Sequence, residues 1–190
     1  MSATNRGSKR SPSDFYPTPK EVIHNFLDHY QLNKEGIILE PCAGDGNFIA
    51  VLRERGYKNK IIANEKYNKH GLKLKKLGAD LVLHRNYIGC GLNKFKHENV
   101  TTIITNPPYS LAQEFIEKSF ELYPNATVIM LLRLAFLESK KRYSFWQKHP
   151  VNKLYVLSTR PSYTGNNKTD ATAYAWFVWD KSNTQEIRVI

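Results

Sequence analysis

Short apolar segments alternate with amphipathic segments along most of this chain, and this alternation constrains its fold more than any other feature. The apolar segments are rich in β-branched and aliphatic residues, which is typical of strands that are buried on both faces. We expect strands over residues 37–40, 60–65, 79–84, 101–105, 126–132, 153–159 and 172–179. The segments between most of them have apolar residues at helical spacing, so the sequence predicts an α/β fold with helices on both faces of a parallel sheet.

Two of the expected helices carry an N-terminal signal. Thr18 is followed by Pro19 and, three residues after the threonine, by Glu21, which together predict a helix capped by the Thr18 side chain. Ser110 and Gln113 have the same spacing at the start of a later helix. Because the carboxyl ends of parallel strands meet at one edge of a sheet, we expect ligand-binding residues in the turns that lead into such helices.

Length and charge limit what else the chain can be. Its 190 residues suit one domain, and we expect a flexible basic tail over residues 1–13 and one folded domain over 14–190. Lysine and arginine outnumber acidic residues by 28 to 17, and the net charge of +11 favours a polyanionic partner. No apolar run approaches the roughly 18 residues of a membrane span. The two cysteines are too few for a disulfide framework or a four-ligand zinc site, so we expect a cytoplasmic protein without a metal.

The turn after the strand at 37–40 reads Glu40-Pro41-Cys42-Ala43-Gly44-Asp45-Gly46. Its glycines let the backbone approach a ligand closely, and the helix that follows offers its N-terminus. A dinucleotide fingerprint would place a small residue three positions after Gly46, where this chain has Ile49. The turn alone therefore fits either a nucleotide site or a tight connection. Glu65, at the end of the next strand, can accept both hydroxyls of a ribose, and the pair favours a nucleoside site.

A second polar turn, Asn106-Pro107-Pro108-Tyr109, follows the strand at 101–105. The two prolines fix their φ angles and remove two backbone donors, so the carbonyl groups there are available as acceptors. The Asn106 oxygen beside such a carbonyl makes a pair of acceptors for one amino group. Tyr109 can stack on the ring that bears this amine. The turn therefore predicts a site for a planar molecule with an exocyclic amino group.

With these motifs the chain resembles the S-adenosylmethionine-dependent amino methyltransferases, and most of all the small DNA adenine-N6 methyltransferases of phages. The resemblance rests on both turns, on Phe15-Tyr16-Pro17-Thr18-Pro19 upstream, and on Arg160-Pro161-Ser162-Tyr163-Thr164-Gly165 near the end, and it extends from about residue 14 to 180. It implies the Rossmann-like fold of class I methyltransferases: a mostly parallel seven-stranded sheet with the last strand antiparallel. Residues 14–190 would form a single catalytic domain without a separate target-recognition domain.

The resemblance also implies roles for individual residues. Those that would line the site of the cofactor S-adenosylmethionine are Tyr16 and Thr18 at its methionine end, Glu40, Pro41, Ala43, Gly44, Gly46 and Phe48 along the glycine turn, Glu65 at the ribose, and Asn86 at the adenine, where the family usually has an acid. The catalytic turn would consist of Asn106, Pro107, Pro108 and Tyr109, with Tyr163 as a second aromatic contact to the target base.

Such a reaction needs positioning more than proton transfer. If Asn106 and the Pro107 carbonyl accept the two amine hydrogens, the nitrogen lone pair is freed to attack, and no histidine or cysteine nucleophile is required. Cys42 is then a packing residue. An amine inside a duplex cannot reach the site, so the base must be flipped out or already single-stranded.

Contacts to a DNA backbone would come from basic residues that follow strands at the edge of the sheet where the two turns lie. We expect these to be Arg133, Arg142, Arg160 and Lys168, with Lys140, Lys141 and the N-terminal tail. Because no long segment lies outside the catalytic sheet, sequence preference would be short, or would come from a partner or from a second copy in a homodimer. The basic stretch at 53–76 fits a solvated outer face better than a DNA contact.

Three other functions fit parts of the same pattern. RNA amino methylation would use the same turn and the same charge. Protein glutamine methylation shares the turn, although enzymes of that kind usually have a larger N-terminal helical domain, and only 39 residues precede Glu40. A non-enzymatic nucleic-acid-binding subunit is opposed by the intact motifs, and cytosine remains an alternative amine within DNA.

Overall fold

The computed structural model describes residues 17–89, 91, 97–162 and 172–190. Its core is an eight-stranded sheet in the order β3-β2-β1-β4-β5-β7-β6-β8. The strands are β1 (Ile37–Glu40), β2 (Lys60–Asn64), β3 (Leu81–Leu83), β4 (Val100–Thr105), β5 (Thr127–Arg133), β6 (Lys153–Val156), β7 (Tyr174–Trp179) and β8 (Glu186–Val189). β7 runs antiparallel to β5 and β6, and every other neighbouring pair is parallel.

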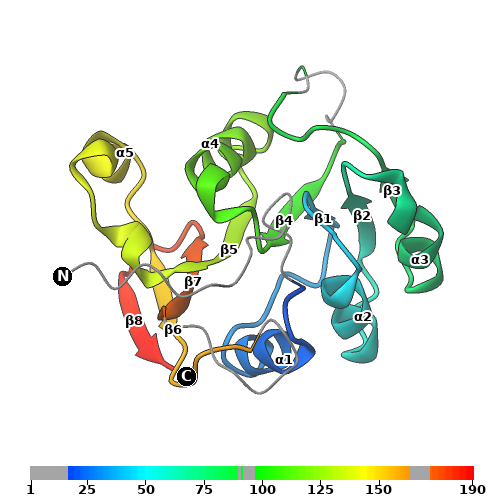
Figure 1. The fold of residues 1–190 in the computed structure, drawn as a ribbon, viewed down its shortest axis with the longest axis horizontal. Helices are drawn as coiled ribbons and strands as arrows, with labels where there is room; N and C mark the ends of the chain where they lie inside the picture. The colour runs from blue at the N-terminus through cyan, green and yellow to red at the C-terminus, as the bar shows by residue number, and fades with distance from the viewer. Residues whose placement is uncertain (1–16, 90, 92–96, 163–171) are drawn as a thin grey trace, which may run out of the picture.

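Helices cover both faces of this sheet, as the alternation predicts (Figure 1). The α-helices are α1 (Lys20–His29), α2 (Asn47–Glu54), α3 (Gly71–Lys76), α4 (Ala112–Leu122) and α5 (Tyr143–Lys148), and the 3-10 turns are η2 (Asn68–His70), η4 (Tyr109–Leu111), η5 (Leu134–Leu137) and η6 (Lys140–Arg142). α1, α2 and α3 pack on one face and α4 and α5 on the other, because alternate residues of each strand point into two separate apolar clusters.

The strand count is the main correction to the predicted fold. Seven strands were expected, with the last one antiparallel; β7 is antiparallel, but β8 follows it and pairs in parallel with β6. β8 is an edge strand that buries little: Ile187 is 75% and Val189 71% exposed. A strand held mainly by backbone pairing on one side needs no apolar run, so the sequence carries no strong signal for it.

Both predicted helix caps are wrong. α1 begins at Lys20 with Pro19 at the N-cap, and α4 begins at Ala112 after the 3-10 turn η4, so neither Thr18 nor Ser110 caps an α-helix. Pro19 has an extended ψ of 139°, which delays the start of α1 by one residue. Thr18 is buried, and its hydroxyl oxygen accepts a hydrogen bond from Asn106 instead.

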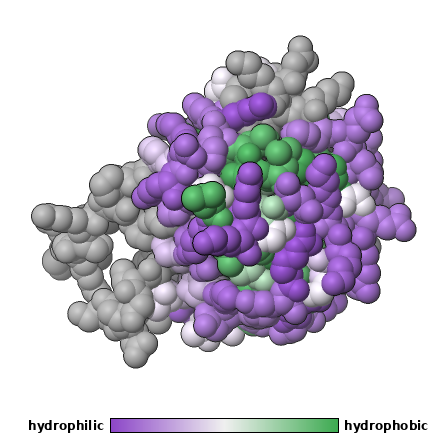
Figure 2. All heavy atoms as spheres, turned by 90° about the vertical axis from the view of Figure 1, so that its right-hand side faces the viewer, coloured by the Kyte–Doolittle hydropathy of each residue, from purple (hydrophilic) through white to green (hydrophobic). Residues whose placement is uncertain are grey.

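The opposite edge of the sheet is β3, with α3 beside it (Figure 1). Figure 2 faces this side: hydrophilic side chains cover most of it, and hydrophobic ones gather in its upper part. The residues of β3 are all partly exposed here, and Leu72 of α3 is 80% exposed. No helix within the described ranges has both the length and the apolar character needed to cross a membrane.

Candidate active site

The glycine turn connects β1 to α2 in a fixed conformation. Gly46 lies at the N-cap of α2 with φ +92°, and a Cβ atom there would lie 2.6 Å from Leu77 Cδ1. Only glycine therefore fits this position without strain. The Gly46 amide donates to the Ala43 carbonyl at 2.9 Å, and the Ala43 amide donates to the Asn64 carbonyl at 2.8 Å. The turn is thereby bound to the end of the neighbouring strand β2.

Glu65 ties this turn to the residues that follow β2. Its Oε2 atom accepts a hydrogen bond from the Gly44 amide at 2.9 Å, and its Oε1 atom accepts one from the Tyr67 amide at 3.0 Å. The side chain is buried at the end of the strand, where the sequence predicted an acid that could hold ribose hydroxyls. Each carboxylate oxygen has more than one lone pair, so these bonds leave acceptor capacity for a ligand.

Asn64 lies in the candidate site, and the sequence analysis did not identify it. Its Nδ2 atom donates to the carbonyls of Pro41 (2.9 Å) and Arg85 (3.0 Å), and its Oδ1 atom accepts from the Arg85 amide (3.1 Å). One buried amide therefore holds together the ends of β1, β2 and β3. A polar residue at the end of the apolar run of β2 was the only signal for it.

Glu40 is a buried carboxyl at the end of β1, 1% exposed. Neither of its oxygens has a hydrogen-bond partner among the described residues. Burial raises the pKa of Glu40 well above its usual range, and the nearby carboxylates of Asp45 and Glu65 raise this pKa further. A buried acceptor of this kind is suited to a ligand that brings a cationic donor.

Cys42 lies in the same turn but is unsuited to nucleophilic chemistry. Burial, with smaller contributions from the carboxylates of Glu65 and Glu40, raises the pKa of its thiol to about 12. The reactive thiolate is therefore scarce at neutral pH. This agrees with the expectation that Cys42 is a packing residue.

Asn106, the last residue before the two prolines, contacts the segment that leads into α1. Its Nδ2 atom donates to Thr18 Oγ1 at 3.0 Å, and the Thr18 carbonyl accepts from Asn47 Nδ2 at 2.9 Å. Asn47 is the first residue of α2, so the chain before α1 is held between the glycine turn and the end of β4. The sequence analysis did not identify Asn47, whose position directly after Gly46 was its only signal.

Tyr109 lies at the junction of three elements. Its ring centroid is 5.6 Å from that of Tyr174, and the Arg133 guanidinium lies 5.0 Å from the centre of the Tyr109 ring. Arg133 and Tyr174 are paired across β5 and β7. The structure therefore places Arg133 beside the Asn106-Pro107-Pro108-Tyr109 turn, at the edge of the sheet where the sequence predicted several basic residues.

The remaining predicted residues divide into three groups. Those near the turns are buried or half-buried: Pro41, Ala43, Phe48, Pro107 and Pro108. Asn86 and Arg160 are exposed after β3 and β6, and Arg142 lies in η6. The predicted contacts Tyr16, Tyr163 and Lys168 lie outside the described residues. No cluster of metal-ligating side chains occurs in the described part of the chain.

Comparisons with known proteins identify the class of fold to which this geometry belongs. No protein-family model and no curated protein sequence matches the chain. A predicted O-methyltransferase, protein Atu636 from Agrobacterium tumefaciens, is similar with a TM-score of 0.59 and 15% identity, over 86% of this chain and 83% of that one. A dimethyladenosine transferase from Plasmodium falciparum is similar with a TM-score of 0.63 and 14% identity, over 86% and 62%.

The 23S rRNA methyltransferase ErmE is similar with a TM-score of 0.63 and 13% identity, over 88% of this chain and 70% of that one. The chain thus spans less than two thirds of the Plasmodium protein and more than two thirds of the other two. At these identities the likeness concerns the fold alone. This chain has the Rossmann-like fold of class I methyltransferases, with the strand order and antiparallel β7 described above.

Proposed function

We propose that this protein transfers a methyl group from S-adenosylmethionine to the N6 amine of adenine in DNA, on a base flipped from the duplex or already single-stranded. The observation that carries this proposal is the position of Asn106. It lies at the end of β4, beside β1 and its glycine turn, and its amide nitrogen is held by Thr18. The oxygen of the same carboxamide therefore points away from Thr18 and can face a substrate amine.

The polar groups of the two turns and of the residues beside them fit S-adenosylmethionine. Glu40 offers a buried, unpartnered carboxyl for the ammonium group of the methionine moiety, and Glu65 offers acceptor lone pairs for the ribose hydroxyls. Thr18 lies beside Asn106 and is suited to the methionine end. When bound, this cofactor supplies an electrophilic methyl group on a positively charged sulfur.

The chain's own residues bind and orient the amine. Asn106 Oδ1 and the Pro107 carbonyl would accept its two hydrogens, which frees the nitrogen lone pair from the ring. Pro107 and Pro108 have no N–H group and so present only acceptors. The ring of Tyr109 stacks on the base and fixes its plane. Catalysis then consists of positioning and fixed dipoles.

Charge supports a nucleic-acid substrate. The net charge is +11, and Arg133 lies at the catalytic turn, where a phosphate near a flipped base would be held. RNA is the second candidate, because the similar solved structures include one named a 23S rRNA methyltransferase and one named a dimethyladenosine transferase. A second copy or a partner would supply sequence preference beyond the short loops of this chain.

The test is incubation with methyl-labelled S-adenosylmethionine and, separately, duplex DNA, single-stranded DNA, RNA and protein, followed by nucleoside and amino acid analysis. We expect N6-methyladenine in DNA. Asn106→Ala should lower the rate at least about 100-fold, as removal of one preorganised polar contact does elsewhere, while the Kd for the cofactor changes little. Label confined to RNA would move the assignment to the second candidate. Label only in protein, or full turnover by Asn106→Ala, would refute the proposal.

A further inference from the structure

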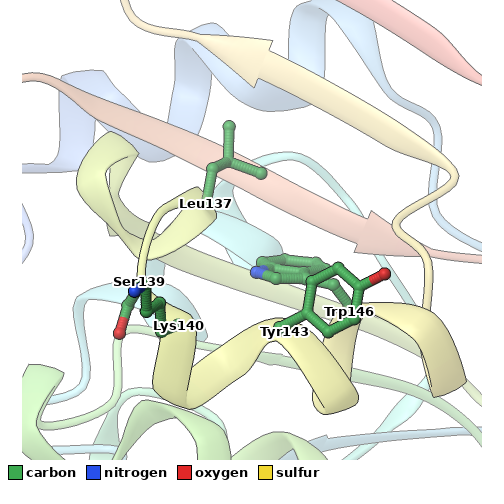
Figure 3. A pocket seen from close by; sticks show the side chains of 5 residues that line it. All are labelled: Leu137, Ser139, Lys140, Tyr143 and Trp146. Atoms are coloured by element: carbon green, nitrogen blue, oxygen red, sulfur yellow. The ribbon is translucent and has the colours of Figure 1, made fainter.

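A groove of about 460 Å³ lies on the segment that joins β5 to β6, outside the site described above. It is lined by Leu137, Ser139, Lys140, Tyr143 and Trp146, which come from η5, η6, α5 and the link between the two 3-10 turns (Figure 3). None of these residues belongs to the proposed cofactor pocket or to the catalytic turn. The groove is therefore separate from the candidate active site.

The wall of the groove is held in place by Arg142. Its Nε atom donates to the Phe136 carbonyl at 2.9 Å, and its Nη2 atom donates to the carbonyls of Ala135 and Glu138. Its guanidinium also lies 4.9 Å from the centre of the Phe136 ring. These contacts fix the loop on both sides of Ser139, which has a φ of +127°. The loop that forms this wall is therefore held by contacts within the chain.

Its surface combines aromatic rings with an unused donor. Tyr143 is 67% exposed, whereas Trp146 lies deeper and stacks on Trp179 with ring centroids 6.3 Å apart. The Trp146 Nε1 atom is buried and has no hydrogen-bond partner among the described residues. Figure 3 shows this nitrogen turned toward the side where Leu137 and Ser139 lie. An occupant with a planar ring and an acceptor atom would stack on Tyr143 and satisfy the indole donor.

The charge of residues 133–148 indicates what kind of molecule would bring a planar ring into the groove. Residues 133–148 include five lysines or arginines and one glutamate. A flat ring attached to a polyanion is a nucleotide within a nucleic-acid strand, and aromatic side chains in basic grooves bind such strands by base stacking. Lys140, at the rim, is placed to meet a phosphate next to the stacked base.

The groove is within reach of the catalytic turn. Arg133, whose guanidinium lies over the Tyr109 ring, is four residues from Leu137. Four residues span at most about 14 Å along the backbone, which is the length of roughly four steps of a duplex strand at ~3.4 Å each. Building on the function proposed above, we propose that the groove binds a base of the substrate strand within about four nucleotides of the target adenine.

The test uses single-stranded oligonucleotides that contain the target adenine and one abasic position, moved stepwise along the strand. Binding to the full chain is measured by fluorescence anisotropy. For the wild type we expect one abasic position to weaken binding about fivefold or more, the loss of one base–aromatic stack. Tyr143→Ala should bind the intact strand correspondingly more weakly and no longer distinguish that position. Leu72→Ala, which removes an exposed apolar side chain on α3, is the matched control and should behave as the wild type.

Trp146→Phe tests the unused donor separately, because it keeps an aromatic ring and removes the N–H group. It should weaken binding of the intact strand but keep the position dependence that Tyr143 provides. A wild-type profile in Tyr143→Ala, or equal penalties at every position in the wild type, would overturn the groove assignment. Methyl transfer to the same oligonucleotides separates the two proposals. If adenine is methylated but binding weakens equally for every abasic position, the groove assignment is refuted and the proposed activity stands.

Discussion

The amide nitrogen of Asn106 donates a hydrogen bond to the hydroxyl oxygen of Thr18 at 3.0 Å, across 88 positions of the chain. This bond joins the end of β4 to the segment before α1, and it fixes which way the Asn106 carboxamide faces. A hydroxyl can accept this bond and still donate its own hydrogen to a ligand. In the function proposed above, Thr18 would position Asn106 and would also be a candidate contact for the cofactor.

Replacing Thr18 by valine keeps its shape and removes the acceptor. Loss of one hydrogen bond of about 1 to 1.5 kcal/mol predicts a roughly tenfold slower methyl transfer, together with weaker cofactor binding. The rate is measured with saturating labelled S-adenosylmethionine, and the Kd by calorimetry. Thr18→Ser keeps the hydroxyl and should retain most of the rate. Equal rates for the valine and serine variants would mean that the bond does not orient Asn106.

Much of the fold could be predicted from the sequence because its signals are local. β1 was predicted over its full range, and α2 follows from the glycine turn and the apolar spacing of Phe48, Ile49 and Leu52. β8 could not be predicted, since an exposed edge strand such as Glu186–Val189 has no burial pattern. Strand periodicity reports which residues are buried, and β8 buries almost none.

The motifs of the candidate site could be predicted from the sequence, whereas the contacts between them could not. The sequence located Glu40, Glu65 and Asn106 at strand ends, but it assigned the Thr18 hydroxyl to a helix cap. A hydroxyl that can bond either the nearest amide or a distant side chain gives the same local pattern in both cases. The sequence analysis missed Asn64 for a related reason, because its hydrogen-bond partners, Pro41 and Arg85, follow two other strands that are distant in the sequence.

The buried carboxyl of Glu40 predicts a pH dependence of stability. Burial and the neighbouring carboxylates raise its pKa in the folded protein, whereas in the unfolded chain it ionises at the usual value. The stability that this group contributes is therefore fully present below the unfolded pKa of about 4.3 and is lost as pH rises toward the folded pKa. Glu40→Gln should increase the free energy of unfolding relative to the wild type at pH 7 and change it little at pH 4.

Urea denaturation at the two pH values measures this difference. Glu54→Gln is the control, because Glu54 is exposed and its pKa is lowered by Lys20, so this variant should give no gain at pH 7. The same Glu40→Gln variant should bind S-adenosylmethionine about tenfold or more weakly, since a hydrogen bond to a charged group is lost. A variant that is less stable than the wild type at pH 7 would contradict the unpartnered state of this carboxyl.

Gly46 and Gly56 form a matched pair for testing the turn. Both have positive φ angles, +92° and +78°, but only at Gly46 would a Cβ atom meet the side chains of Leu77 and Leu74. Gly56→Ala should cost about 1 kcal/mol from backbone strain, and Gly46→Ala about 2 to 4 kcal/mol because steric overlap is added. Urea denaturation measures both. Equal costs would show that the two leucines move aside freely.

Tyr109 and Arg133 contact each other, and we expect them to contribute to substrate binding in different ways. Tyr109→Ala should weaken substrate binding and slow methyl transfer by a combined 1 to 3 kcal/mol, roughly one lost stack, whereas Tyr109→Phe keeps the ring and should stay near the wild type.

Arg133→Ala should lower the slope of log affinity against log salt by about one, as loss of one phosphate contact does. Lys75→Ala, on the outer helix α3, should leave this slope unchanged. An unchanged slope in Arg133→Ala would restrict Arg133 to packing against Tyr109, because a side chain that neutralises a phosphate must release a counterion.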